Sequence, residues 1–215
     1  MSVSDLKLYH SSASPNARRV RILIAEKGQT VPLVAVDLGQ REQHSDTYRQ
    51  INPRGVVPTL LLPDGTALGE TPVILRYLDE VLPGPSLFGS TPEDRAITAM
   101  WERRVELEGF AAVMEGVRNA AAGLKRRAIS GPHDYDQIPA LIDRSRSRVD
   151  NFYADFDARL KEIPFIAGSN FSAADITALA TVDFATKAFS KPIPDDHVAL
   201  KLWHEKVSAR PSASA

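Results

Sequence analysis

Alternating apolar and polar side chains open the chain and predict a β-strand over residues 6–10. Residues 15–27 repeat apolar side chains at helical spacing, and Gly28 marks the end of that predicted helix. A β-branched run over residues 31–36 predicts a second strand. The polar stretch 39–50 has no clear periodicity, and no element is predicted there. The pattern therefore predicts a strand–helix–strand unit, which brings two strands together in parallel.

A hairpin and a helix are predicted to complete this first region. Two apolar runs, 59–62 and 66–68, flank a Pro-Asp-Gly turn and predict two antiparallel strands. The next helix is predicted over residues 71–81, with Thr71 at the N-cap and Pro72 at the first helical position. The region thus combines a parallel strand pair with an antiparallel hairpin.

Beyond residue 90 the apolar positions follow helical spacing throughout. Three stripes are expected to face a core: Ile97, Met100, Trp101 and Val105; Val149, Phe152 and Phe156 within a helix at 141–160; and Ile176, Leu179, Ala180 and Phe184. Residues 83–90 are rich in Pro, Gly and Ser, which is typical of a linker. We therefore predict an α/β domain over residues 1–82 and an all-helical domain of about five helices over residues 91–215.

Composition limits the function classes that need to be considered. The chain is 43% hydrophobic and 25% charged, with a net charge of -1. There is thus no excess of basic residues to indicate binding to nucleic acid or to an anionic membrane. No segment is apolar enough to span a bilayer, and residues 1–5 lack the pattern of a secretory signal, so a cytoplasmic location is expected. There is no cysteine, so any sulfur chemistry must use the sulfur of a ligand. The five histidines have no metal-ligand spacing, and no metal is predicted.

Three short segments of the first region have both a structural and a functional interpretation. Ser14 before Pro15 is typical of a helix N-cap, but the same helix N-terminus can bind an anion, to which the hydroxyl can donate. Pro58 stands directly before a predicted strand. Most X–Pro bonds are trans, whereas a cis Val57–Pro58 bond would turn the Val57 backbone toward an open edge that an extended peptide could join.

The third segment is Glu70-Thr71, at the start of the second predicted helix. In the structural interpretation, Thr71 serves only as the N-cap of this helix. Alternatively, its N–H and hydroxyl can bind a ligand carboxylate while Glu70 binds an ammonium group beside it. An anion site next to a carboxylate matches the α-amino-acid end of a ligand.

Together these segments resemble a known family. The runs Ser14-Pro15-Asn16, Asn52-Pro53-x-Gly55-x-Val57-Pro58 and Glu70-Thr71 resemble the glutathione site of cytosolic glutathione transferases, in particular the serine-type bacterial members. The run Phe171-Ser172-Ala173-Ala174-Asp175 is similar to the capping box of that family's core helix. The similarity extends from about residue 6 to residue 212.

The resemblance implies a thioredoxin-like N-terminal domain, an all-helical C-terminal domain, a homodimer, and glutathione as a co-substrate that attacks a small hydrophobic electrophile. It assigns Ser14 and Asn16 to the thiolate, Gln43 and His44 to the glycine carboxylate, Val57 and a cis Pro58 to the cysteinyl part, and Glu70 and Thr71 to the γ-glutamyl group. Met114, Arg118 and Asn119 are the candidates for contact with the electrophile. Solvated surface roles stay open for Gln43 or His44, and for Arg118 and Asn119.

Other functions fit the same fold. A non-catalytic interaction module would keep the fold, although such modules usually lose the ligand-facing residues that are present here. A specialised glutathione-dependent isomerase, peroxidase, dehalogenase or disulfide reductase would use the same thiolate. Ser172 and Asp175 are predicted to have a folding role, so that Asp175→Ala costs about 1–3 kcal/mol of stability and leaves glutathione affinity intact.

Overall fold

The protein is described by a computed structural model that covers residues 5–215. The first four residues, on which the expected lack of a secretory signal partly rests, lie outside the described part. The chain divides into two compact units, and the division falls between Ser86 and Leu87, within the segment 83–90 that was predicted as a linker. Two short pieces, 130–132 and 214–215, group with the first unit.

The first unit contains a four-stranded sheet in the order β2-β1-β3-β4. Its strands are β1 (Lys7–His10), β2 (Leu33–Ala35), β3 (Thr59–Leu61) and β4 (Ala67–Leu68). β1 pairs with β2 in parallel and with β3 antiparallel, and β4 joins β3 antiparallel. The predicted parallel pair and the predicted hairpin are therefore both confirmed.

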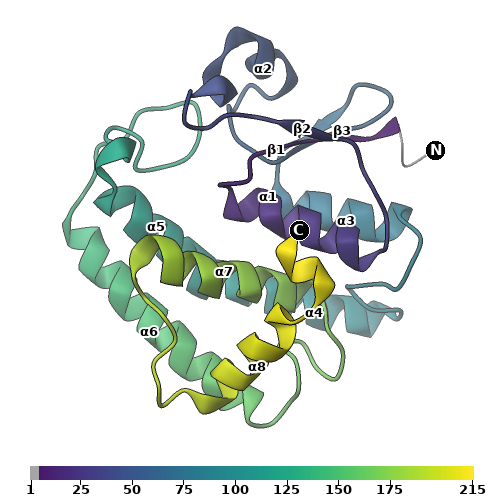
Figure 1. Cartoon of the computed structure of the whole chain (residues 1–215), viewed down its shortest axis with the longest axis vertical. Coiled ribbons are helices and arrows are strands. Elements are labelled where there is room, and N and C mark those ends of the chain that lie inside the picture. Colours follow the sequence, from purple (N-terminus) through teal and green to yellow (C-terminus); the bar gives the residue numbers. More distant parts are fainter. Residues whose placement is uncertain (1–4) are drawn as a thin grey trace. The chain divides into compact units, whose positions relative to one another are not determined.

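Two long helices cover one face of this sheet. They are α1 (Pro15–Glu26) and α3 (Thr71–Val81), which lie side by side beneath the strands in Figure 1. The buried side chains Leu8, Leu60, Leu23 and Ile74 come from the strands and from both helices, and they form the core of the unit. Burial of such side chains from water is what holds the helices against the sheet.

Two expectations for the first unit are wrong. A short helix, α2 (Asp46–Ile51), and a 3₁₀ turn, Glu42–His44, occupy the stretch for which no element was predicted. Helix α3 spans the predicted residues Thr71–Val81, but its N-cap is Glu70 and not Thr71, which is the first helical residue. Thr71 therefore does not cap the helix, and its hydroxyl is available for another partner.

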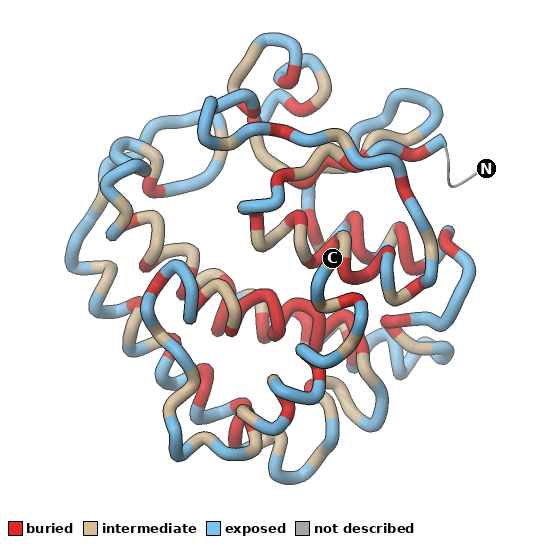
Figure 2. The backbone as a smooth tube through the Cα atoms, viewed as in Figure 1, coloured by how far each residue is buried: buried red, intermediate tan, exposed pale blue. Residues whose placement is uncertain are grey.

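The second unit is helical. Its α-helices are α4 (Pro92–Arg104), α5 (Ala111–Ala120), α6 (Ala140–Leu160), α7 (Ala173–Phe189) and α8 (Val198–Ser208), and a π-helical segment, Val105–Phe110, joins α4 to α5. Helix α7 is the centre of the unit, and Figure 2 shows buried residues along most of its length. Ser172 and Asp175 form the predicted capping box at its start.

The predicted core stripe of α4 is wrong in part. Val105 is buried as expected, but Ile97 is 45% exposed and Met100 is 51% exposed. Thr98 and Glu102 face the core in their place, and the hydroxyl of Thr177 on α7 donates to Glu102 Oε1 over 3.2 Å. The most apolar face of α4 is therefore not the face that this chain covers.

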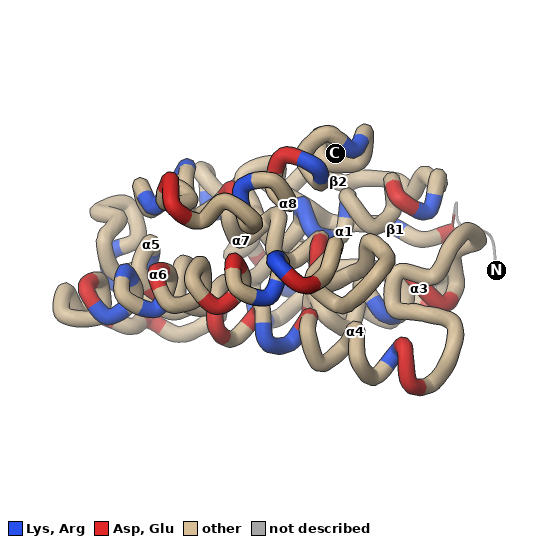
Figure 3. Tube along the Cα trace, turned by 90° about the horizontal axis from the view of Figure 1, so that it is seen from below, with Lys and Arg blue, Asp and Glu red and all other residues tan. Residues whose placement is uncertain are grey.

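Basic and acidic residues alternate along the backbone of both units, as the colours of Figure 3 show. Within residues 5–215, no helix is both long enough and apolar enough to cross a membrane.

Candidate functional site

The topology of the first unit collects its predicted site segments at one end of the sheet. Tyr9 of β1 lies opposite Thr59 of β3, and Leu60 of β3 lies opposite Leu68 of β4. Because these pairs are antiparallel, the carboxyl ends of β1 and β4 adjoin the amino end of β3. The segment after β1 leads to Ser14, the segment before β3 contains Val57 and Pro58, and the segment after β4 leads to Thr71.

Ser14 is the N-cap residue of α1. Its Oγ accepts a hydrogen bond from the Ala17 N–H over 3.2 Å, and the side chain is buried. The capping interpretation is therefore confirmed. A hydroxyl that accepts in this way still carries a proton to donate, so capping and binding of an anion at this helix N-terminus are compatible.

Asn16 is held by an arginine that the motif did not include. The Asn16 Oδ1 accepts from Nη1 of Arg19 over 3.0 Å, and Arg19 is completely buried. With its oxygen directed to Arg19, the amide presents its Nδ2–H groups in other directions, and these have no hydrogen-bond partner among the described residues. Asn16 is thus oriented as a donor. The spacing of three residues on one helix is the signal that could have identified Arg19.

The Val57–Pro58 peptide bond is cis, so the alternative of an ordinary trans loop is wrong. Neither the N–H nor the C=O of Val57 makes a backbone hydrogen bond to any residue from 5 to 215. This half-buried residue therefore offers one donor and one acceptor side by side, which is the arrangement that an extended peptide needs to add as a strand.

A buried polar network fixes the loop before Pro58. Tyr48 Oη donates to the Val56 carbonyl over 2.7 Å and lies 2.9 Å from Thr59 Oγ1. Asn52 Nδ2 donates to the same two oxygens, over 3.2 Å to Val56 and 2.8 Å to Thr59. Tyr48 and Thr59 were not singled out from the sequence, because their contacts depend on how α2 folds back on the strand.

Glu70 and Thr71 start α3. The Thr71 side chain is buried, and its hydroxyl has no hydrogen-bond partner among the described residues. Glu70 is exposed, makes no capping hydrogen bond, and lies 3.6 Å from Nη1 of the equally exposed Arg54. An ion pair at such exposure contributes little, so the Glu70 carboxylate can exchange this partner for a ligand cation.

Gln43 and His44 lie in the 3₁₀ turn that precedes α2. Gln43 is buried, so the alternative of a solvated surface role is wrong for this residue, and no described residue forms a hydrogen bond with its Oε1. Both residues pack against Gly55, which has φ +60°; a Cβ on Gly55 would lie 2.8 Å from the Gln43 carbonyl and from His44 Nδ1. Only glycine combines this φ with so close an approach. The turn is thereby attached to the loop that carries Val57.

The three electrophile candidates lie on α5 of the second unit. Met114 and Arg118 are four residues apart on one helix face and are both partly buried. Asn119 is buried; its Nδ2 donates to the Glu115 carbonyl over 2.8 Å and its Oδ1 accepts from the Ile138 N–H over 2.7 Å. The alternative of a simply solvated side chain is therefore wrong for Asn119. Asn119 attaches the end of α5 to the segment that precedes α6, and its contact with an electrophile stays a prediction.

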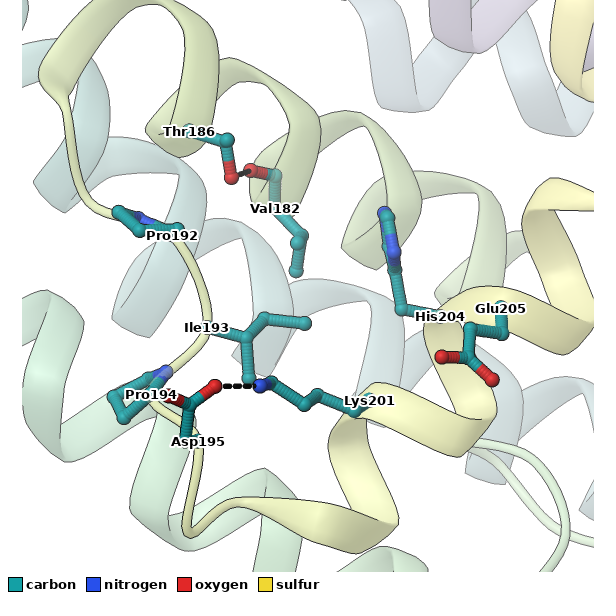
Figure 4. A pocket seen from close by; sticks show the side chains of 9 residues that line it. All are labelled: Val182, Thr186, Pro192, Ile193, Pro194, Asp195, Lys201, His204 and Glu205. Atoms are coloured by element: carbon teal, nitrogen blue, oxygen red, sulfur yellow. Dashed lines mark hydrogen bonds and ion pairs between the residues drawn. The ribbon is translucent and has the colours of Figure 1, made fainter.

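A cavity of about 600 Å³ lies between α7, the connection after it and α8, as Figure 4 shows. None of the predicted site residues lines it. Its polar groups are largely engaged with one another or with neighbours: Lys201 pairs with Asp195, and His204 Nε2 lies 2.9 Å from an oxygen of Asp183. The remaining charged group, Glu205, is exposed to solvent, so no buried unpartnered group among the described residues indicates a ligand in this cavity. No cluster of three or more acidic or histidine side chains that could hold a metal ion occurs in the described part of the chain.

Comparison with known proteins gives the same family from both halves of the chain. A family model described as glutathione S-transferase, N-terminal domain, matches residues 8–86, and one described as glutathione S-transferase, C-terminal domain, matches residues 139–206. Glutathione S-transferase 2 of Saccharomyces cerevisiae is 33% identical over 208 residues, which are 95% of this chain and 86% of that relative.

Solved structures are similar over both units. A glutathione S-transferase domain-containing protein of Marinobacter aquaeolei has 37% identity and a TM-score of 0.88, with 96% of this chain and 98% of that chain covered. The crystal structure of Gtt2 from Saccharomyces cerevisiae has 32% identity and a TM-score of 0.87, with 97% and 98% covered. These similarities include the sheet of the first unit and the helices of the second.

Proposed function

The chain belongs to the glutathione S-transferase family, and we propose that it binds glutathione at the end of the sheet where β1, β3 and β4 meet. The observation that carries this proposal is the unpaired backbone of Val57 beside the cis Pro58. The cysteinyl backbone of glutathione would pair with Val57 as a short added strand. Thr71 would bind the γ-glutamyl carboxylate at the start of α3, and Glu70 would bind its ammonium group.

The other end of glutathione is assigned to the turn before α2. Gln43 and His44 would contact the glycine carboxylate, and the side-chain amide of Gln43 would donate an Nε2–H to that carboxylate. Gly55 keeps this turn beside the loop that carries Val57. The turn before α2 would then bind one end of the tripeptide, the loop that carries Val57 its middle, and the start of α3 its other end.

The reaction requires a thiolate. A free cysteine thiol has a pKa of about 8.5, so it is mostly protonated at neutral pH. Lowering that pKa by about two units requires roughly 2.7 kcal/mol, which one charge-assisted hydrogen bond and the α1 dipole can supply. Ser14 would donate its hydroxyl proton to the sulfur, and the Asn16 amide is a second donor. The thiolate then forms a C–S bond to the electrophile, whose leaving group departs with the bonding electrons, and the thiol proton goes to solvent.

The electrophile is assigned to α5 of the second unit, where Met114 supplies an adaptable apolar contact and Arg118 a polar one. Asn119 is kept as a third candidate. A cytoplasmic location and a role in detoxification stay predictions.

Calorimetric titration of glutathione tests the assignment. We expect micromolar to millimolar affinity for the unaltered protein, a loss of about tenfold or more for Glu70→Ala and for Thr71→Val, and little change for Ser14→Ala. Glu80→Ala is the matched control, since Glu80 is an exposed glutamate at the other end of the same helix. No binding to the unaltered protein at millimolar glutathione would leave the non-catalytic interaction module as the better interpretation.

We also propose that the protein is a homodimer. The second unit exposes Ile97, Met100 and Leu107, which are 45%, 51% and 48% exposed, along α4 and the π-helical segment. Contiguous exposed apolar side chains on a folded protein typically mark an interface, and the family resemblance implies a second copy of this chain as the partner.

Sedimentation velocity measures this state directly. We expect a dimer for the unaltered protein and a shift to monomer for Met100→Lys, because a lysine cannot be buried unpaired at an apolar contact. Leu202→Lys is the control, as Leu202 is 61% exposed on α8. A monomer at micromolar concentration without any substitution would exclude the dimer.

A further inference from the structure

Arg118 is an unusual arginine because part of its guanidinium is buried and has no partner among residues 5–215. It lies in the last turn of α5, and its Nε is buried with no hydrogen-bond acceptor. No carboxylate or carbonyl among residues 5–215 forms a hydrogen bond or an ion pair with this guanidinium. Arginine is almost always paired when it is buried, so the absence needs an explanation.

Glu115, the acidic residue closest to Arg118 along α5, is already engaged. Glu115, one turn before Arg118, contacts Arg144 over 2.7 Å and Ser145 over 2.9 Å. Burial raises the pKa of Glu115, but the hydrogen bonds from Arg144 and Ser145 and the charges of Arg144 and Arg148 outweigh it, so the pKa is lowered. Glu115 is therefore a firmly ionised partner of α6 and is not available to Arg118.

The charged side chain that acts on Arg118 is another cation, Arg127. In the segment after α5, Asp134 pairs with Arg126 over 2.9 Å, and Arg127 donates to the Gly123 carbonyl. Burial lowers the pKa of the Arg118 guanidinium, and the nearby positive charge of Arg127 lowers it further. Both effects destabilise the charged guanidinium of Arg118, so a bound anion would stabilise it.

A purely structural role does not account for this arrangement. A cation in the last turn of a helix gains about 0.3–1 kcal/mol from the dipole, whereas a buried donor without an acceptor costs about 1–3 kcal/mol. The carbonyls of Arg118 and Ala121 at the end of α5 are moreover occupied, since Gln137 Nε2 donates to both over 2.8 Å. The guanidinium therefore does not cap its own helix.

We propose that the electrophile of this enzyme carries a carboxylate and that Arg118 binds it. This inference rests on the proposed function, because it takes α5 as the electrophile-binding helix. The planar fork of a guanidinium matches the two oxygens of a carboxylate. Met114, on the same face of α5, contacts the apolar body of the same molecule. Arg118 is thus the residue that makes the enzyme prefer acidic over neutral electrophiles.

Binding of two matched ligands tests this proposal without relying on turnover. The probes are S-(2,4-dinitrophenyl)glutathione and its analogue with one carboxylate added to the aromatic ring. Calorimetry is expected to give tighter binding of the carboxylated conjugate, and Arg118→Gln is expected to weaken that conjugate by about 30-fold while leaving the neutral conjugate unchanged. Arg118→Lys should retain part of the preference, because a point charge replaces the fork.

Thermal unfolding separates a binding role from a structural role. Because the buried Nε of Arg118 has no partner among residues 5–215, its removal should raise the melting temperature of the ligand-free Arg118→Gln protein slightly or leave it unchanged. The matched control is Arg126→Gln, which removes an exposed, paired arginine from the same part of the unit and should not alter the preference.

Each result has a definite meaning. Equal affinity of the unaltered protein for both conjugates, or an equal effect of Arg118→Gln on both, overturns the proposed role of Arg118 and leaves the proposed function standing. A lower melting temperature with equal losses identifies a structural role and overturns it as well. If neither glutathione nor either conjugate binds, the proposed function fails first, and the inference fails with it.

Discussion

Replacing Asp175 with alanine is expected to lower the free energy of unfolding by about 4 kcal/mol, the largest stability loss that we expect from a single substitution here. Asp175 is completely buried at the start of α7. Its Oδ1 accepts from the Ile166 N–H and from Trp203 Nε1, each over 2.9 Å. Its Oδ2 accepts from the N–H and the hydroxyl of Ser172, over 3.0 Å and 2.9 Å.

This expectation exceeds the 1–3 kcal/mol that a capping box alone suggests. One carboxylate satisfies donors from three separate segments, so alanine leaves four buried donors unpaired in addition to the lost cap. An unsatisfied buried donor costs about 1–3 kcal/mol, and partial rearrangement or entry of water reduces the sum.

Urea denaturation measures this loss, with Asp143→Ala as control. Asp143 also lies in the first turn of a helix, α6, but it is exposed, and its replacement should cost less than about 1 kcal/mol. The glutathione affinity of the folded Asp175→Ala protein should be unchanged, because Asp175 belongs to the second unit. A small change in unfolding free energy, or a lost affinity at unchanged stability, would contradict the folding role.

Features that depend on neighbours in the sequence were predictable. The hairpin could be predicted because alternation and a Pro-Asp-Gly turn specify it locally, and the Ser172–Asp175 box could be predicted because both partners lie within one helical turn. Helix α2 was missed, although Ser45 is its N-cap and the Ser45 side chain accepts a hydrogen bond from the Tyr48 N–H. Six residues are too few for periodicity to appear, so only the cap could have indicated it.

Features that depend on tertiary neighbours were not predictable. Periodicity identified the apolar face of α4 but could not tell whether this chain or another covers it, which is why Ile97 and Met100 were wrongly placed in the core. In the same way, the motif indicated Asn52 and Val57 but not Tyr48, whose hydroxyl reaches the Val56 carbonyl after α2 has folded back. Arg118 was a candidate for a polar contact, but its lack of a partner is visible only in three dimensions.

The largest effect on catalysis is expected from Ser14. Ser14→Ala should raise the pKa of the bound glutathione thiol by about one to two units, because the sulfur loses a charge-assisted hydrogen bond. Each unit lowers the thiolate fraction by about tenfold at pH values below the pKa, so kcat/KM at neutral pH should fall by about 10- to 100-fold. The loss should diminish as the pH is raised, since at high pH the thiol ionises without help.

The pH profile distinguishes this role from the capping role of Ser14. Loss of the hydrogen bond from Ala17 to Ser14 should cost about 1 kcal/mol of stability at any pH. Thr91→Ala removes a comparable cap, in which Thr91 Oγ1 accepts from the Asp94 N–H, and should lower stability without moving the pH profile. Ser14→Thr keeps a hydroxyl and should restore most of the activity.

Asn16 is the candidate for a second hydrogen-bond donor to the thiolate, beside Ser14. Its amide is oriented as a donor by the buried Arg19, so Asn16→Ala should raise the thiol pKa by a further amount, about half a unit to one unit. Ultraviolet absorbance of the bound thiolate measures both shifts directly. Because two donors to one sulfur act independently to a first approximation, the double variant should show nearly the sum. If Asn16→Ala moves the profile and Ser14→Ala does not, the thiolate donor is Asn16, and Ser14 only caps the helix.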